Sequence, residues 1–385
     1  MKEIYLDHAA TTPLVPEVID AVTDCLKNDY GNPSSLHRLG IRAEKRIKDA
    51  KLKVSELIKA SPEEILFTSG GTEANNTAIL GTAYDKKRRG MHCITTAIEH
   101  PSVLEAFSHL ESQGYEVNYL PVNRDGVVSP EDIKNCLRED TILVSIMHVN
   151  NETGSIQPIK EIGSILNAQK NRPVFHVDAV QSFGKLEILP HFLGIDLMSL
   201  SGHKIHGPKG IGALFIRKGV RIQPIIFGGK QEGGLRSGTE NIPGITGMGA
   251  AAEWTARRKE ETPYYLSGLK KMLAEGIKRT LPDAVINGGL KNTAPHILSV
   301  SFPGLGGEIL LHALEEKGVY VSTGSACSSR SRKYSHVLKA LNLDNSTIEG
   351  SIRISISYLT TEEEIRSFIP ILAETVKRIG RFTRR

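Results

Sequence analysis

Short apolar runs alternate with longer segments of helical periodicity along the first two-thirds of the chain. The runs predict strands at Ile65–Thr68, His92–Thr96, Glu116–Val122, Ile142–Val149, Val174–Val177, Leu197–Leu200 and Gly212–Ile216. Because most of these runs are nearly continuously apolar, the sheet that they form must be covered on both faces. The pattern therefore predicts an α/β fold, with a mostly parallel sheet flanked by helices in a large domain.

The pattern changes near residues 253–261, where charged residues become frequent. The stretch from Trp254 to about Leu281 predicts one long helix, and strand-like runs follow it at Ile297–Phe302, Val319–Ser322 and Ser351–Tyr358. Thr360-Thr-Glu-Glu363 has the form of a capping box and predicts the start of a last helix. We expect this part of the chain to form a smaller α+β domain.

Polar residues follow several of the predicted strands at the point where each strand ends. They are Ser69-Gly-Gly-Thr72, Glu99-His100, Asn150-Asn151, Asp178 and Ser201-Gly-His-Lys204. In an open parallel sheet, ligands bind beyond the carboxyl ends of the strands. The sequence therefore predicts one site that gathers these side chains.

Three of these segments have both a chemical and a purely structural interpretation. Burial would lower the pKa of Lys204 and free its amine to attack a carbonyl, although most lysines in turns are solvated. The glycines before Thr72 can bring backbone N–H groups to an anion at a helix N-terminus, or serve turn geometry alone. Asp178 can either cap the next helix or pair with a protonated ring nitrogen.

Composition narrows the classes of function. Lys and Arg number 48 against 43 Asp and Glu, so the net charge of +5 gives no footprint for nucleic acid or an anionic membrane. No signal-peptide pattern and no apolar run of about 18 residues is present, so we expect no membrane segment. His203 and His206 lack an H-E-x-x-H pattern and a third ligand, so no metal site is predicted.

The chain has four cysteines, Cys25, Cys93, Cys136 and Cys327, and none forms a CxxC pair. This count argues against disulfides and favours a reducing, cytoplasmic setting. Cys327 lies among small residues and is followed by Arg330, Arg332, Lys333 and His336, an electropositive setting that favours a thiolate. The other three cysteines lie in apolar or helical contexts and are interpreted as packing residues.

Together, the motifs resemble pyridoxal-phosphate enzymes of fold type I in the class V aminotransferase group, and among them the cysteine desulfurases of the NifS/IscS type. The resemblance covers essentially the whole chain. It rests on Leu6-Asp-His-Ala-Ala-Thr-Thr12, Gly31-Asn-Pro-Ser-Ser35, Thr68-Ser-Gly-Gly-Thr-Glu-Ala-Asn75, Glu99-His100, His148-Val-Asn-Asn-Glu-Thr-Gly154, His176-Val-Asp-Ala-Val-Gln181, Ser201-Gly-His-Lys204, Arg236-Ser-Gly-Thr-Glu-Asn241 and Ser322-Thr-Gly-Ser-Ala-Cys-Ser-Ser329.

The resemblance implies a set of residues for the cofactor, pyridoxal 5'-phosphate. Lys204 binds it covalently, Asp178 pairs with its ring nitrogen and Gln181 bonds its phenolic oxygen. His100 stacks on the ring and can move protons. The phosphate group is implied to contact Gly71, Thr72, Ser201 and His203, together with Thr239 of a second subunit, so the resemblance also implies a homodimer.

The resemblance further implies the reaction and its partners. Asn151 contacts the cofactor and the substrate carboxylate, and Arg353 clamps that carboxylate, although an arginine in an alternating strand usually points to solvent. Lys204 removes the Cα proton of L-cysteine, and Cys327 takes the sulfur as a persulfide while L-alanine leaves. Sulfur acceptor proteins would be iron–sulfur scaffolds or tRNA-thiolation enzymes, without direct nucleic-acid binding.

Other interpretations remain open on the sequence alone. A selenocysteine lyase or a transaminase would share the fold, and a catalytically idle cofactor-binding scaffold would share the cofactor residues. The expected division is an N-terminal arm at residues 1–15 that joins the small domain, a large cofactor-binding domain at 16–255, and a small domain at 256–385 that carries the Cys327 loop.

Overall fold

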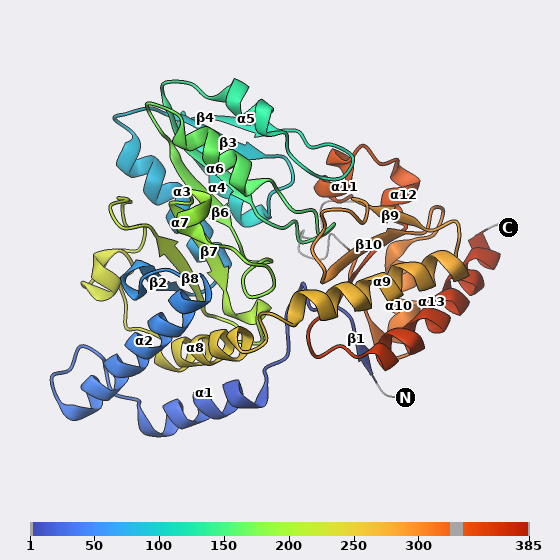
Figure 1. Cartoon of the computed structure of the whole chain (residues 1–385), viewed down its shortest axis with the longest axis horizontal. Coiled ribbons are helices and arrows are strands. Elements are labelled where there is room, and N and C mark those ends of the chain that lie inside the picture. Colours follow the sequence, from blue (N-terminus) through green and yellow to red (C-terminus); the bar gives the residue numbers. More distant parts are fainter. Residues whose placement is uncertain (1–2, 324–333, 384–385) are drawn as a thin grey trace.

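The predicted strands of the first two-thirds of the chain form one large sheet (Figure 1). The computed structural model describes residues 3–323 and 334–383. In that part of the chain the sheet has the order β2-β8-β7-β6-β5-β3-β4. Its strands are β2 (Ile65–Thr68), β3 (His92–Thr96), β4 (Glu116–Leu120), β5 (Thr141–Met147), β6 (Val174–Asp178), β7 (Leu197–Ser201) and β8 (Gly212–Ile216). Strands β3 to β7 run parallel and β8 runs antiparallel to both of its neighbours, so the predicted mostly parallel sheet is confirmed.

Helices cover both faces of this sheet because successive residues of each central strand enter opposite cores. Leu143 and Val174 pack with α3 and α4, whereas their neighbours Val144 and Phe175 pack with α2 and α8. The helices of this part are α1 (Pro16–Asn28), α2 (Arg38–Leu57), α3 (Gly71–Lys86), α4 (Pro101–Ser112), α5 (Pro130–Cys136), α6 (Ile159–Asn167), α7 (Pro190–Leu193) and α8 (Ile242–Ala256), with the short 3-10 turns η1 (Pro62–Glu64), η2 (Gly202–Lys204) and η3 (Gln231–Gly234).

Most of the remaining elements surround a separate apolar core, whereas Val337 and Leu341 pack into a core of the large sheet. An antiparallel sheet of order β12-β10-β9 consists of β9 (Val285–Asn287), β10 (Ile297–Ser301) and β12 (Ser351–Ser355). The N-terminal strand β1 (Ile4–Tyr5) pairs with β11 (Val319–Tyr320), so the start of the chain lies beside its last third (Figure 1). The helices here are α9 (Thr262–Thr280), α10 (Gly307–Glu315), α11 (His336–Ala340), α12 (Asn345–Glu349) and α13 (Glu362–Thr383).

The prediction of one helix from Trp254 to about Leu281 is wrong. The structure has two helices there, with α8 ending at Ala256 and α9 beginning at Thr262. Pro263 lies in the first turn of α9, where a missing N–H and a fixed φ are tolerated, whereas in the interior of a continuous helix the proline ring would clash with the preceding turn. The helix start predicted near Thr360 lies one residue later, since the Glu364 N–H donates to Thr361 Oγ1 at 3.2 Å.

Candidate active site

A cavity of about 220 Å³ lies where β5, β6 and β7 end and α3 and α4 begin. Ten of the side chains and backbone positions singled out in the sequence line this cavity: Gly71, Thr72, His100, Asn151, Asp178, Gln181, Ser201, His203, Lys204 and Arg353. They come from segments up to 282 residues apart, between Gly71 and Arg353. Most of them meet because the parallel strands of the large sheet end at the same edge, whereas Arg353 comes from β12 of the small antiparallel sheet.

The carboxylate of Asp178 lines the cavity and is held in place by hydrogen bonds. Asp178 is 6% exposed, and its Oδ2 accepts a hydrogen bond of 2.8 Å from Asn75 Nδ2. Its Oδ1 accepts a bond of 3.0 Å from the Val180 N–H. Turns follow Asp178 and the next helix is α7 at Pro190–Leu193, so the interpretation of Asp178 as a helix cap is wrong. Its side chain instead closes a local turn and lines the cavity.

Lys204 ends the 3-10 turn that follows β7 and reaches the N-terminal arm. Its Nζ donates to the carbonyl oxygens of Ala9 and Ala10, at 2.5 and 2.7 Å. The side chain is half-buried and lines the same cavity as Asp178. The arm at residues 9–10 therefore fixes the amine in place.

His100 caps the N-terminus of α4, as its position before Pro101 suggests. Its Nδ1 accepts a hydrogen bond of 3.1 Å from the Ser102 N–H. Burial lowers the pKa of His100, a shift that Asp178 opposes and Lys204 reinforces. The imidazole is therefore neutral near pH 7, and because Nδ1 is an acceptor its proton lies on Nε2.

Arg353 corrects the expectation that an arginine in this strand points to solvent. It is 3% exposed, and its guanidinium donates to the Asn151 carbonyl at 3.0 Å and to Asp7 Oδ1 at 2.7 Å. All five residues of β12 are buried, so alternation along this strand does not separate a solvated face from a core face. The Arg353 Nε has no hydrogen-bond partner among the described residues.

Comparisons with known proteins agree with this arrangement. The family model described as "Aminotransferase class-V" matches residues 4–368. This chain belongs to the class V aminotransferase family. A cysteine desulfurase IscS from Dictyoglomus turgidum is 45% identical over 378 residues, which are 98% of this chain and 95% of the relative.

Solved structures place the chain among the cysteine desulfurases of this family. A "NIFS-like protein" superposes with a TM-score of 0.92 at 39% identity, covering 98% of this chain and 100% of the other. The structure described as "SspA in complex with cysteine" has a TM-score of 0.82 at 36% identity, covering 94% of this chain and 100% of the other. Cysteine desulfurases are class V enzymes with the fold type I architecture, and they depend on pyridoxal 5'-phosphate.

The cavity fits this cofactor on two observations. Ser201 Oγ and Gln181 Oε1 are buried polar atoms that have no hydrogen-bond partner among the described residues, and both side chains line the cavity. Gly71 begins α3 and lines the cavity, and an added Cβ there would lie 2.7 Å from Val180 Cγ2, so only glycine lets this helix N-terminus lie against Val180 at the cavity. A phosphate group finds N–H donors at such a helix N-terminus.

Two of the expected residues are not in this cavity. Thr239 is exposed and lines a separate cleft of about 200 Å³ beside Gly210 and Arg236. Cys327 lies outside the described residues. Burial raises the pKa of Cys93 to about 12 and also raises that of Cys25, so for these two the packing interpretation holds.

The sequence reasoning missed several contributors to the cavity. Asn75 lies three residues after Thr72 on α3, and this helical spacing could have placed it on the same face. Ser102 Oγ accepts a hydrogen bond of 2.8 Å from Asn75 Nδ2. The sequence did not indicate it, because this segment was interpreted only through His100 and its role as a helix cap. The carbonyls of Ala9 and Ala10 left no signal, since any residue carries a carbonyl.

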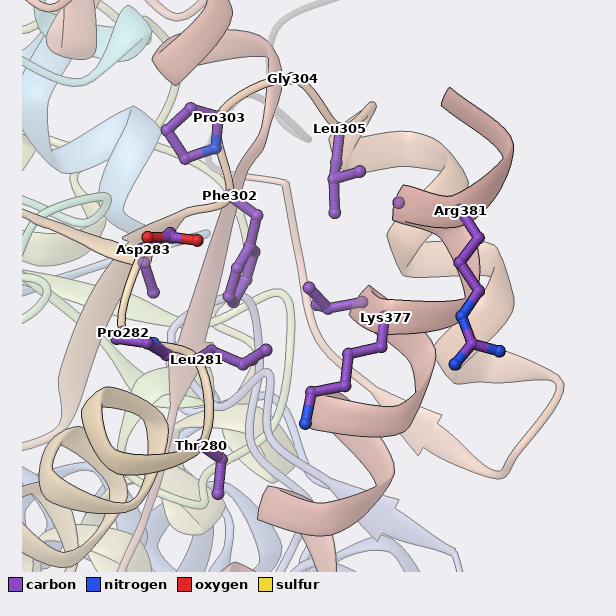
Figure 2. Close-up of a pocket in the computed structure, with 13 residues that line it drawn as sticks. Thr280, Leu281, Pro282, Asp283, Phe302, Pro303, Gly304, Leu305, Lys377 and Arg381 are labelled. Carbon is purple, nitrogen blue, oxygen red and sulfur yellow. The ribbon is translucent and has the colours of Figure 1, made fainter. Parts of the chain in front are cut away.

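A larger cleft of about 540 Å³ lies elsewhere, between the end of α9, the loop after β10 and the last turns of α13. Lys377 and Arg381 project from α13 along one side of it, across from Phe302 (Figure 2). None of the residues singled out in the sequence lines this cleft, so its size does not make it the candidate active site. Along residues 3–323 and 334–383, no helix is long and apolar enough to cross a membrane.

Proposed function

We propose that this chain, as a cysteine desulfurase, converts L-cysteine to L-alanine and leaves the sulfur as a persulfide on Cys327. The observation that carries the proposal is the meeting of Lys204, Asp178 and His100 in one buried cavity. The pyridoxal phosphate would be held by Lys204 covalently, by Asp178 at the ring nitrogen and by Gln181 at the phenolic oxygen. When bound, it supplies an electron sink for the electrons released at Cα.

The chain's own residues perform the remaining tasks. Arg353 is suited to bind the substrate carboxylate through its planar fork, with Asn151 beside it. Lys204 Nζ takes the Cα proton, and His100 can hold or deliver a proton at Nε2. The Cys327 thiolate attacks the substrate sulfur, the carbon–sulfur bond breaks, and the carbon fragment gains protons to leave as alanine.

A persulfide assay with L-cysteine tests this proposal. Cys327→Ala should keep the visible absorbance of the bound cofactor and lose formation of alanine and persulfide, whereas Cys136→Ala, as a matched control, should keep both. Lys204→Ala should lose the visible band of the lysine-bound cofactor. Normal rates in Cys327→Ala, or an unchanged band in Lys204→Ala, would contradict the assignment.

The same assay separates the rival functions. A transaminase would need a keto-acid acceptor, whereas a desulfurase releases alanine without one. A selenocysteine lyase would favour selenocysteine in a direct comparison of kcat/KM, and an idle scaffold would form no persulfide. The structural relative solved with cysteine favours the thiol substrate.

The proposal extends to a homodimer whose partner subunit contributes Thr239. Large apolar side chains are exposed on and between α1 and α2: Ile19, Leu26, Tyr30, Leu36 and Ile41. Obligate dimers bury such residues. We further propose the division into an arm (1–15), a large domain (16–255) and a small domain (256–385), which is supported by the apolar core that Ile4 and Leu6 share with residues 266–379.

The sulfur acceptors proposed for this chain are an iron–sulfur scaffold protein or a tRNA-thiolation enzyme in the cytoplasm. The mobile sulfur would be carried by Cys327, so the acceptor must approach that residue. Capture of acceptors on protein that holds a trapped Cys327 persulfide would distinguish the two. Recovery of only one class would identify the partner, and equal recovery from Cys327→Ala protein would contradict transfer through this thiol.

A further inference from the structure

A second lysine is buried close to Lys204, and the proposed chemistry gives it no role. Lys185 is 8% exposed and lies in the segment after β6, four residues beyond Gln181. Among the described residues its Nζ has one hydrogen bond, a long one of 3.5 Å to the Gln181 carbonyl. A buried ammonium group with three protons and one weak acceptor is poorly compensated.

The backbone is built to turn this lysine inward. Gly184, just before it, has φ +72°, and an added Cβ there would lie 2.7 Å from Thr255 Cγ2 and 2.9 Å from Ile205 Cγ2. Only glycine fits such a left-handed and crowded position. Lys185 and Lys204 both line one small cavity of about 30 Å³.

The groups that surround Lys185 do not neutralise its charge. Burial lowers the pKa values of four histidines, with Lys185 as a further cause. They are His8 near the N-terminus, His203 and His206 beside Lys204, and His296 just before β10. Among the described residues no carboxylate forms an ion pair with Lys185. Burial and the neighbouring Lys204 lower the pKa of Lys185 to about 7.

We propose that Lys185 is a positioning residue for Lys204: its ammonium charge disfavours a second proton on the neighbouring nitrogen. Two like charges in one low-dielectric pocket repel, so a proton on Lys185 and a proton on the nitrogen of Lys204 disfavour each other. This keeps the nitrogen of Lys204 available to take a proton during the reaction. The inference rests on the proposed role of Lys204.

Two substitutions of opposite electrostatic effect test the inference in the holoenzyme. The measurement is the pH midpoint of the visible absorption band of the bound cofactor without substrate, which reports protonation of the nitrogen that joins Lys204 to the cofactor. Lys185→Met removes the neighbouring charge and should raise the midpoint by roughly one pH unit. Lys185→Arg keeps the charge at every pH and should lower the midpoint or leave it at the wild-type value. The wild-type midpoint should therefore not lie above that of Lys185→Met or below that of Lys185→Arg.

Lys270→Met is the matched control. Lys270 is also buried, with its pKa lowered to about 8, but it donates to Thr293 Oγ1 at 2.7 Å and to the Ala294 carbonyl at 2.8 Å. Its substitution should lower stability and leave the midpoint unchanged. A midpoint that is equal in all variants, or that moves in the same direction in Lys185→Met and Lys185→Arg, overturns the inference.

Two further outcomes are also decisive. If Lys185→Met does not fold, Lys185→Gln takes its place, because it removes the same charge and keeps a donor for the Gln181 carbonyl, and a midpoint that does not rise in that variant overturns the inference. A wild-type band that persists in Lys204→Ala refutes the proposed role of Lys204 itself. A normal wild-type band with no response to Lys185 variants refutes the inference alone.

Discussion

Glu152 shows how a single buried group can link stability to pH. It is 5% exposed and accepts a hydrogen bond of 2.6 Å from Ser335 Oγ, and Ser335 in turn caps α11. Burial raises the pKa of Glu152 from 4.5 to about 7, with Arg353 acting in the opposite direction. The folded state therefore binds more protons than the unfolded state between these two values, and its stability falls as the pH rises through them.

Glu152→Gln should remove this dependence, because the amide keeps an acceptor for Ser335 and cannot ionise. The free energy of unfolding, measured with urea, should fall less between pH 5 and pH 8 in the variant than in the wild type, the wild type losing up to about 1.4 kcal/mol per pH unit from this group. The exposed Glu161→Gln is the control and should behave as wild type. A wild-type slope in Glu152→Gln would contradict the buried neutral carboxyl.

At the residue level, the sequence predicted side chains better than backbone groups. The residue types at strand ends and the family resemblance pointed to Lys204, Asp178 and Arg353, and all three line the cavity. Physical reasoning alone misjudged Arg353, because its burial depends on the packing of β12 against distant segments. The Ala9 and Ala10 carbonyls could not be predicted, since a carbonyl becomes specific only when the fold brings another residue to it.

At the level of elements, apolar runs gave strand positions more reliably than charge patterns gave helix boundaries. Strands β2, β3 and β8 have the predicted bounds, because polar or glycine residues end each run. The break between α8 and α9 was missed because a charged stretch looks the same in an exposed helix and in a turn, and only Pro263 marked it. The strands β11 and β12 are shorter than predicted, since pairing with a neighbour rather than apolarity decides where a strand ends.

The capping box of α13 gives a prediction at this level. The Thr361 N–H donates to Glu364 Oε2 at 2.8 Å, and the Glu364 N–H donates to Thr361 Oγ1 at 3.2 Å. Thr361→Ala should lower the free energy of unfolding by about 1 kcal/mol, whereas Thr361→Ser should retain most of it. An unchanged free energy of unfolding in Thr361→Ala would mean that the cap is not where this geometry has it.

At the level of the whole molecule, the position of Thr239 leads to a prediction about shared sites. Thr239 is exposed and lies outside the cavity of its own chain, whereas Lys204 lies within it. If each active site combines Lys204 of one subunit with Thr239 of the other, two different inactive chains can repair each other. If each site instead used Lys204 and Thr239 of the same chain, mixing could not restore activity, because every site would then contain one of the two substitutions.

The experiment pairs Lys204→Ala with Thr239→Glu, whose carboxylate should repel the cofactor phosphate and abolish activity on its own. In a mixed dimer, the site that uses Lys204 of the second chain receives the intact Thr239 of the first. With random pairing of equal amounts, about half of the dimers are mixed and each has one intact site, so the persulfide assay should recover about a quarter of wild-type activity. Co-expression with Lys204→Ala,Thr239→Glu double-variant chains in place of the Lys204→Ala chains is the control and should recover none, because the single intact lysine then meets only a substituted Thr239. No recovery with the single variants, in mixed dimers shown to form, would contradict a phosphate contact supplied by the second subunit.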